Sequence, residues 1–174
     1  DVCSSDLVNL ATGQGGSGRQ AGSAFKPFTL AAAMEARYSL SSTWNGPATI
    51  TIPDEACYTD GKPWTLSNAS DEESGVFTLR DATAHSVNTV YAQLVSLVGP
   101  AAVVDVAGRL GIRSDLQPYC AITLGSEGVN PLEMTTAYAT LAARGIHHES
   151  TPVLSIEDVA GNELETLEIG RAHV

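Results

Sequence analysis

A serine and a lysine three residues apart, Ser23 and Lys26, are the two side chains in this sequence best suited to covalent chemistry. A serine hydroxyl is a poor nucleophile at neutral pH, and it needs a base within hydrogen-bonding reach to take its proton. Residues three apart on a helix lie on the same face, so Lys26 can meet Ser23 without a long-range contact. We therefore interpret Ser23 as a candidate nucleophile and Lys26 as its general base.

Lys26 can act as a base only if it is held partly in its neutral form, because an ammonium cannot accept a proton. Burial against Phe25 and Phe28 favours the neutral amine. The N-H groups at a helix start favour an alkoxide at Ser23. Pro27 is well tolerated only in the first helical turn, which predicts a helix that begins close to Ser23.

A second polar motif, Ser86–Asn88 with the sequence Ser-Val-Asn, lies further along the chain. Thr78 followed by Asp81 resembles a capping box and predicts a short helix before the motif. Residues 89–98 show helical spacing of apolar side chains after it. The motif therefore falls in a break between two helices, where polar residues without a catalytic role are also common. Its position after Ser23 and Lys26 favours a functional interpretation.

The other expected elements are mainly helices. Residues 25–38 predict a largely buried helix, and 101–110 and 131–144 predict two more with proline at or before their start. Residues 48–52 and 151–159 alternate as strands do. Gly161-Asn162 predicts a hairpin turn, with most of its second strand missing from the chain. The helices together predict a compact lobe.

The chain has 174 residues, of which 43% are hydrophobic and 17% charged, which is typical of one globular domain with a core. A net charge of -11 and only two lysines argue against nucleic-acid binding. No apolar run is long enough to span a bilayer, and there is no leader pattern. No C-x-x-C pair occurs, and we expect the His147-His148 doublet to be solvated, so we predict no metal and no cofactor.

Residues 1–7 and 169–174 resemble the translation of a sequencing-adapter oligonucleotide, so we expect them not to belong to the fold. The native part is then residues 8–168, and Cys3 falls outside it. Cys57 and Cys120 remain, each beside a tyrosine in an expected loop. A disulfide in an oxidising compartment and two buried free thiols are both open alternatives.

Several blocks in the same order resemble the transpeptidase domain of class A penicillin-binding proteins. They are residues 19–28 with Ser23 and Lys26, residues 75–82 leading into 86–89, and residues 124–127 with 129–134 and 137–139. The resemblance implies an α/β fold of the penicillin-binding and serine β-lactamase type, with a five-stranded antiparallel sheet against helices. Residues 8–168 would hold part of this transpeptidase domain, mainly its helical lobe with a few short strands.

The resemblance also implies a role for each candidate residue. Ser23 would be the acylated nucleophile, with its backbone N-H as half of an oxyanion hole, and Lys26 its general base. Ser86 would pass a proton to the leaving amine, and Asn88 would hold the peptide carbonyl of the substrate. The reaction would be peptidoglycan D,D-transpeptidation between donor and acceptor stem peptides, with β-lactams as covalent inhibitors. The whole protein would carry a membrane anchor and a glycosyltransferase domain and would act on the extracytoplasmic face of the bacterial membrane.

Two departures from the family pattern stand out. Ala21 occupies a position where the family usually has proline, which should only loosen the loop. The third family motif, a K-T-G on a strand, is absent, and Lys62 in Gly61-Lys62-Pro63 does not fit it. We expect that strand beyond residue 168, and we expect the chain alone to be inactive and marginally stable.

Two other functions remain as alternatives. A serine β-lactamase or a β-lactam-sensing receptor domain uses the same first two motifs. However, the long polar segment 39–77 and the block 75–81 match the class A synthases better, and no deacylating base is identified. A non-catalytic module that binds a wall peptide or a protein is the other. The joint presence of Ser23, Lys26, Ser86 and Asn88 argues against it.

Overall fold

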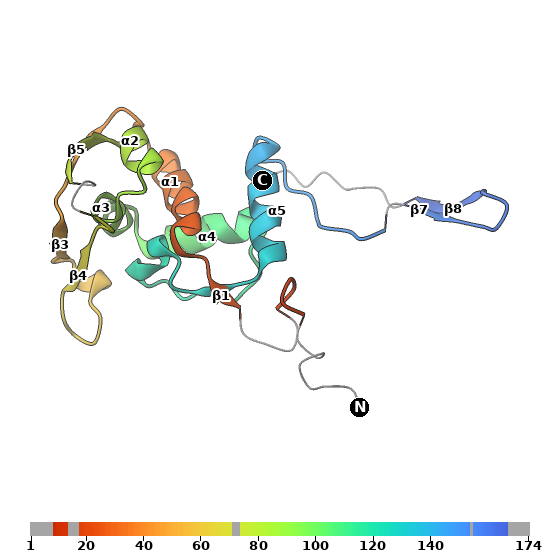
Figure 1. The fold of residues 1–174 in the computed structure, drawn as a ribbon, viewed down its shortest axis with the longest axis horizontal. Coiled ribbons are helices and arrows are strands. Elements are labelled where there is room, and N and C mark those ends of the chain that lie inside the picture. Colours follow the sequence, from red (N-terminus) through yellow and green to blue (C-terminus); the bar gives the residue numbers. More distant parts are fainter. Residues whose placement is uncertain (1–8, 14–17, 71–73, 154, 167–174) are drawn as a thin grey trace.

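The computed structural model describes residues 9–13, 18–70, 74–153 and 155–166 (Figure 1). Residues 1–7 and 169–174, which we expect to be foreign to the fold, lie outside this part. The α-helices are α1 (Lys26–Glu35), α2 (Leu79–Ala84), α3 (Asn88–Val98), α4 (Pro100–Leu110) and α5 (Pro131–Ala142). Short 3-10 helices are η2 (Gly22–Phe25), η3 (Glu55–Cys57) and η5 (Cys120–Leu124).

The strands of the described residues form two-stranded antiparallel pairs. The pairs are β1 (Arg19–Gln20) with β6 (Gly128–Val129), β2 (Thr43–Gly46) with β5 (Gly75–Thr78), β3 (Thr49–Ile52) with β4 (Trp64–Ser67), and β7 (Ser155–Glu157) with β8 (Glu163–Thr166). The strand predicted at 48–52 is confirmed. The expectation that the partner of the 151–159 strand is mostly missing was wrong, because β8 lies within the chain. The β7–β8 hairpin stands apart from the helices in Figure 1.

The helices form the lobe that the sequence predicts, with α1 packed against both α3 and α4. Phe25 and Phe28 are buried and meet edge to face, with ring centroids 4.6 Å apart. Both belong to a core cluster that includes Val95 of α3 and Val103 of α4. Burial of these apolar groups against each other holds the start of α1 in the middle of the lobe.

Side chains cap the starts of α2 and α5, and the cap predicted at Thr78 is confirmed. The Thr78 hydroxyl oxygen accepts from the Asp81 backbone N-H at 3.1 Å, and its O-H donates to the Asp81 carboxylate at 2.7 Å. Asn130 accepts from the Glu133 N-H at 3.0 Å, directly before Pro131. These side chains satisfy N-H groups that have no partner inside the helix.

His147 is buried, so the expectation of a solvated histidine doublet was wrong for this residue. Its side chain is 6% exposed, and its Nδ1 lies 3.0 Å from the Thr140 hydroxyl of α5. Hydrogen bonds from Arg113, and then from His147, hold the pKa of the Glu149 carboxyl below its usual value. The turn at Gly145 returns the chain along α5, which brings His147 inside. The described residues contain no cluster of three or more His, Cys, Asp or Glu that could hold a metal ion.

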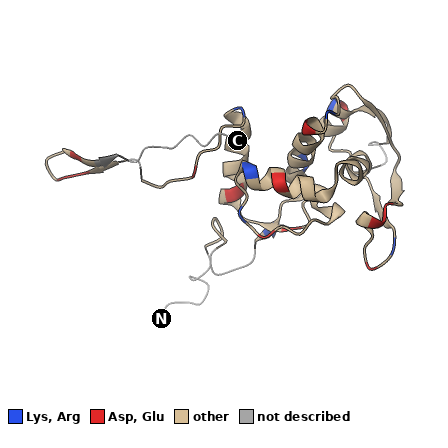
Figure 2. Ribbon diagram, turned by 180° about the vertical axis from the view of Figure 1, so that it is seen from behind, with Lys and Arg blue, Asp and Glu red and all other residues tan. Residues whose placement is uncertain are grey.

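Charged residues occupy scattered positions along the ribbon in Figure 2, where the Lys and Arg positions of the described residues are coloured separately from one another. Arg109 of α4 donates to Glu35 of α1 at 2.7 Å and to Asp105 at 2.9 Å. Exposed ion pairs of this kind contribute little to stability. No single helix of the described residues is long and apolar enough to cross a membrane; α3 and α4 together pass that test but are bent by 95°.

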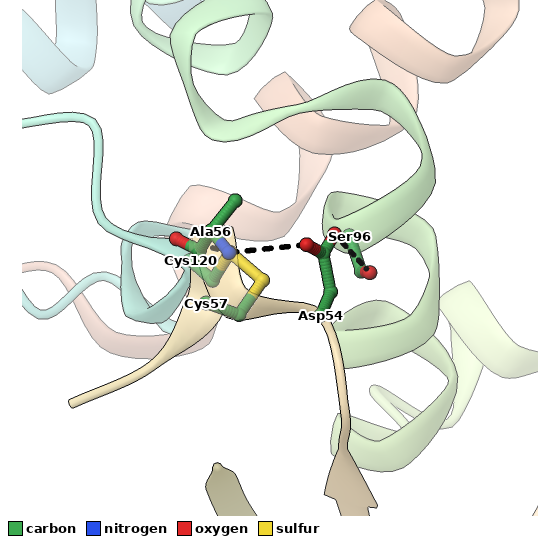
Figure 3. The surroundings of a disulfide bond; sticks show 5 residues. All are labelled: Asp54, Ala56, Cys57, Ser96 and Cys120. Atoms are coloured by element: carbon green, nitrogen blue, oxygen red, sulfur yellow. Dashed lines mark hydrogen bonds between the residues drawn. A yellow bond between two sulfur atoms is a disulfide. The ribbon is translucent and has the colours of Figure 1, made fainter. Parts of the chain in front are cut away.

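Cys57 of η3 and Cys120 of η5 form a disulfide, with their Cα atoms 5.1 Å apart (Figure 3). The disulfide, not the pair of free thiols, is therefore the alternative that the structure bears out. Both cysteines are buried in the core cluster that contains Phe25 and Phe28. The bond closes a loop across a sequence separation of 63 residues.

Loss of this bond should destabilise the domain, because the unfolded chain would regain the entropy of an open loop. We expect replacement of Cys57 and Cys120 by serine to lower the free energy of unfolding by about 4 kcal/mol. Urea unfolding of the oxidised proteins measures this difference, and Cys3→Ser is the matched control, expected to change nothing. An unchanged midpoint in the double variant would contradict a stabilising bond.

Candidate active site

The four candidate residues meet around one atom, the Nζ of Lys26. This nitrogen donates to the Ser23 hydroxyl oxygen at 3.1 Å, to the Ser86 hydroxyl oxygen at 2.8 Å and to the Asn88 carbonyl Oδ1 at 2.6 Å. The backbone carbonyl of Ser86 is a fourth acceptor within reach of this nitrogen, so one N-H is shared between two oxygens. Two motifs about sixty residues apart in sequence are therefore joined in space through the lysine.

Ser23 and Lys26 lie at different depths in the structure. Ser23 is exposed on η2, whereas Lys26, the first residue of α1, is only 2% exposed. Pro27 follows in the first helical turn, as the sequence predicts. The serine itself lies in a 3-10 turn rather than in the α-helix, which refines the prediction. The exposed Ser23 hydroxyl is thus hydrogen-bonded to a buried amine.

Ser86 owes its two contacts with Lys26 to an uncommon backbone conformation. Its φ is 58°, in the left-handed region, between the end of α2 and the start of α3. A residue other than glycine in this region costs about 1–3 kcal/mol and persists where its surroundings impose it. The neighbouring Val87 is fully buried, which anchors the turn. The turn directs both the hydroxyl and the carbonyl of Ser86 at the same ammonium.

Asn88 is held from behind by the end of β4 and the residue after it. Its Nδ2 donates to the Ser67 carbonyl at 3.1 Å. The next residue of the strand-to-loop segment, Asn68, accepts from the Thr89 N-H at 3.0 Å and donates to the Pro47 carbonyl at 3.1 Å. Asn68 thereby helps to fix the first turn of α3. Sequence reasoning missed this role, because the partners of Asn68 lie about twenty residues away in sequence and no local pattern connects them.

An aromatic ring completes the surroundings of the lysine. Nζ lies 5.5 Å from the centroid of the Tyr91 ring, one helical turn after Asn88. Burial raises the pKa of the Tyr91 phenol, although a hydrogen bond with Thr83 opposes the shift. The phenol therefore stays neutral near pH 7, and its ring face attracts a cation.

The turn that carries Ser23 is shaped by a close approach of two glycines. Gly125, at the end of η5, has φ +67°, and a Cβ at this position would lie 2.3 Å from the Gly22 carbonyl oxygen. The Gly22 N-H donates back to the Gly125 carbonyl at 3.4 Å. From α5, the Tyr138 hydroxyl donates to the Ala24 carbonyl at 2.8 Å. Backbone contacts on both sides of Ser23 thus fix its place.

The arrangement can move a proton between two hydroxyls through one nitrogen. An ammonium has three N-H donors, whereas a neutral amine has two and a lone pair. In the neutral form, Lys26 can accept the Ser23 proton at the same separation over which it now donates. Ser86 lies within hydrogen-bonding distance of that nitrogen and can pass a proton onward.

The comparisons with known proteins identify a family for the chain. Residues 16–172 match the family model described as the penicillin-binding protein transpeptidase domain. Penicillin-binding protein 1A of Aquifex aeolicus (strain VF5) is 34% identical over 152 residues, and that of Neisseria gonorrhoeae is 32% identical over 144 residues. These matches cover 84% and 82% of this chain but 20% and 18% of the relatives. The chain therefore spans about a fifth of their length.

Solved structures share the fold. Penicillin-binding protein 1A from Haemophilus influenzae matches with a TM-score of 0.80 at 29% identity, over 95% of this chain and 24% of that one. PonA1 from Mycobacterium tuberculosis in complex with penicillin V matches with a TM-score of 0.72 at 30% identity, over 86% of this chain and 41% of that one. The expectation of a partial penicillin-binding fold is confirmed.

The contact between Gly125 and Gly22, next to Ser23, can be tested by adding one methyl group. We expect Gly125→Ala to lower the free energy of unfolding by about 1 kcal/mol or more, because alanine is strained at this φ and its Cβ meets Gly22. Gly108→Ala in α4 is the matched control. Its methyl group meets no neighbouring element within 4 Å and should stabilise the helix by about 0.5–1 kcal/mol. Equal effects of the two variants in urea unfolding would contradict the close approach.

Proposed function

The chain belongs to the transpeptidase domain family of penicillin-binding proteins, and we propose that Ser23 is the acylated nucleophile of a serine-type D,D-transpeptidase. The complete protein would cross-link peptidoglycan stem peptides. The observation that carries this proposal is the convergence of Ser23, Ser86 and Asn88 on the buried nitrogen of Lys26. A buried amine in contact with an exposed serine hydroxyl is what activation of that hydroxyl requires.

In the acylation step, neutral Lys26 takes the proton of the Ser23 hydroxyl. The Ser23 oxygen attacks the carbonyl carbon of the penultimate D-alanine in the donor stem. The tetrahedral intermediate then collapses, the peptide bond breaks, and Ser86 hands the proton from Lys26 to the leaving D-alanine amine. An ester on Ser23 and free D-alanine result. An amine of the acceptor stem then attacks the ester, forms the new peptide bond and restores Ser23.

Asn88 would hold the donor substrate. Its amide Nδ2 carries two N-H groups, and one of them donates to the Ser67 carbonyl. The second can donate to a peptide carbonyl of the stem. The Oδ1 of the same amide accepts from Lys26, so the substrate and the base would be aligned by one side chain.

The oxyanion of the intermediate needs donors on both sides. The backbone N-H of Ser23 would supply one, and loss of one such donor typically costs about 3 kcal/mol in the barrier. We place the other on a K-T-G strand beyond residue 168, in a transpeptidase domain of which residues 8–168 are a part. The same strand would bind the substrate carboxylate.

The setting of the complete protein follows from its relatives and its chemistry. PonA1 has been solved in complex with penicillin V, which supports β-lactam binding, and we infer that β-lactams acylate Ser23 here. The resemblance to class A penicillin-binding proteins leads us to propose a complete protein with a membrane anchor and a glycosyltransferase domain. The Cys57–Cys120 disulfide is consistent with an oxidising, extracytoplasmic location.

Mass spectrometry after β-lactam exposure tests the nucleophile. In the complete protein we expect one stable adduct on Ser23, no adduct in Ser23→Ala, and a normal adduct in Ser41→Ala, a control at an exposed serine. The isolated 174-residue chain, without the K-T-G strand, should not be acylated at ordinary rates, because half of the oxyanion hole is missing.

Two other outcomes would favour an alternative function, and a third concerns the K-T-G strand. Rapid loss of the adduct with turnover of penicillin would favour a β-lactamase. No adduct on the complete protein would favour a non-catalytic binding module. Efficient acylation of the isolated chain would refute the need for the missing strand.

A further inference from the structure

The short helix η3 is tied to α3, the helix that begins with Asn88. Asp54 precedes η3, and its Oδ1 accepts from the Ala56 N-H at 3.0 Å. Its other oxygen accepts from the Ser96 hydroxyl of α3 at 3.1 Å. Figure 3 shows the Asp54 carboxylate between these two partners. One carboxylate thus caps η3 and attaches it to α3, the helix that starts at the Ser86–Asn88 motif.

The same short helix is tied by a covalent bond to η5. The Cys57–Cys120 disulfide lies next to Ala56 and the Asp54 contact in Figure 3. Both cysteines are buried, at 4% and 2% exposure. A bond in the core cannot move without its neighbours, since packing there is close. The distance between η3 and η5 is therefore fixed.

From η5 the connection continues to the nucleophile. The residue directly after η5 is Gly125, which lies against the backbone of Gly22. Gly22 is the residue before Ser23, and the turn η2 that contains both has only four residues. A shift of η5 would be passed directly to the Ser23 hydroxyl, because the two glycine backbones are in contact.

We propose that the Cys57–Cys120 disulfide is a positioning pair for the nucleophile. It holds η5, and through Gly125 the turn η2, at a fixed separation from α3. Ser23 and Asn88, which approach Lys26 from opposite ends of this path, are thereby kept in register. The inference rests on the proposed role of Ser23 and adds to it a residue pair outside the reactive centre.

The competing explanation is that the bond only stabilises the domain. The two explanations differ in what happens in the protein that remains folded. A purely stabilising bond changes the folded fraction and leaves the acylation rate of folded molecules unchanged. A positioning pair changes that rate, because a small misplacement of a reacting group slows its reaction strongly.

The experiment uses the complete protein and a fluorescent penicillin, with the binding constant and the acylation rate constant measured separately. In Cys57→Ser/Cys120→Ser we expect the acylation rate constant of the folded protein to fall roughly tenfold or more. The binding constant should change little. Circular dichroism at the assay temperature gives the folded fraction.

Leu110→Ala is the control for stability, because Leu110 is a core residue at the end of α4 and is neither one of the groups proposed to react nor part of the path that positions them. We expect it to lower the unfolding midpoint while the acylation rate constant stays unchanged. Ser96→Ala breaks the other tie without touching the disulfide, and it should slow acylation in the same direction by a smaller factor. This variant provides the test if the double variant does not fold.

An unaltered acylation rate constant in the folded double variant overturns this inference and leaves the proposed function standing. If the double variant does not fold, an unaltered rate constant in Ser96→Ala has the same meaning. An equal fall in Leu110→Ala also overturns it. Absence of acylation in the unaltered complete protein overturns the proposed function and this inference with it.

Discussion

The burial of Lys26 is the constraint on which the rest of the site depends. A lysine nitrogen in the core is tolerated only when its hydrogen bonds are satisfied. Here the partners come from the turn before α1, from Ser86 and from the first residue of α3. The elements that carry them must therefore pack together before the lysine can be accommodated. The contacts that allow Lys26 to be buried are therefore the same contacts that bring the candidate catalytic residues together.

Burial of apolar side chains and short polar contacts together hold these elements in place around Lys26. Phe25 and Phe28 place the start of α1 in the core, while Val87 anchors the strained turn at Ser86. The irregular segment between α1 and α2 contributes Ser67 and Asn68, which hold the start of α3. A stretch without long elements thus serves as the support of the reactive centre.

The sequence predicted the features whose causes are local. The pair at Ser23 and Lys26, the Thr78 cap and the strand at 48–52 all follow from spacing, capping or alternation over a few residues. The pairing of β2 with β5 and the contact of Gly125 with Gly22 depend on residues far apart, so no local pattern marks them. The same holds for the burial of His147, which a return of the chain along α5 produces.

The central claim is that the Lys26 amine activates Ser23. Lys62 provides a matched comparison, because it is the only other lysine of these 174 residues and is exposed. Acylation of the complete protein by a fluorescent penicillin should be measured for Lys26→Met and Lys62→Met. We expect Lys26→Met to acylate about 10²–10⁴-fold more slowly and Lys62→Met to be unchanged. A folded Lys26→Met variant that acylates at the normal rate would contradict the claim.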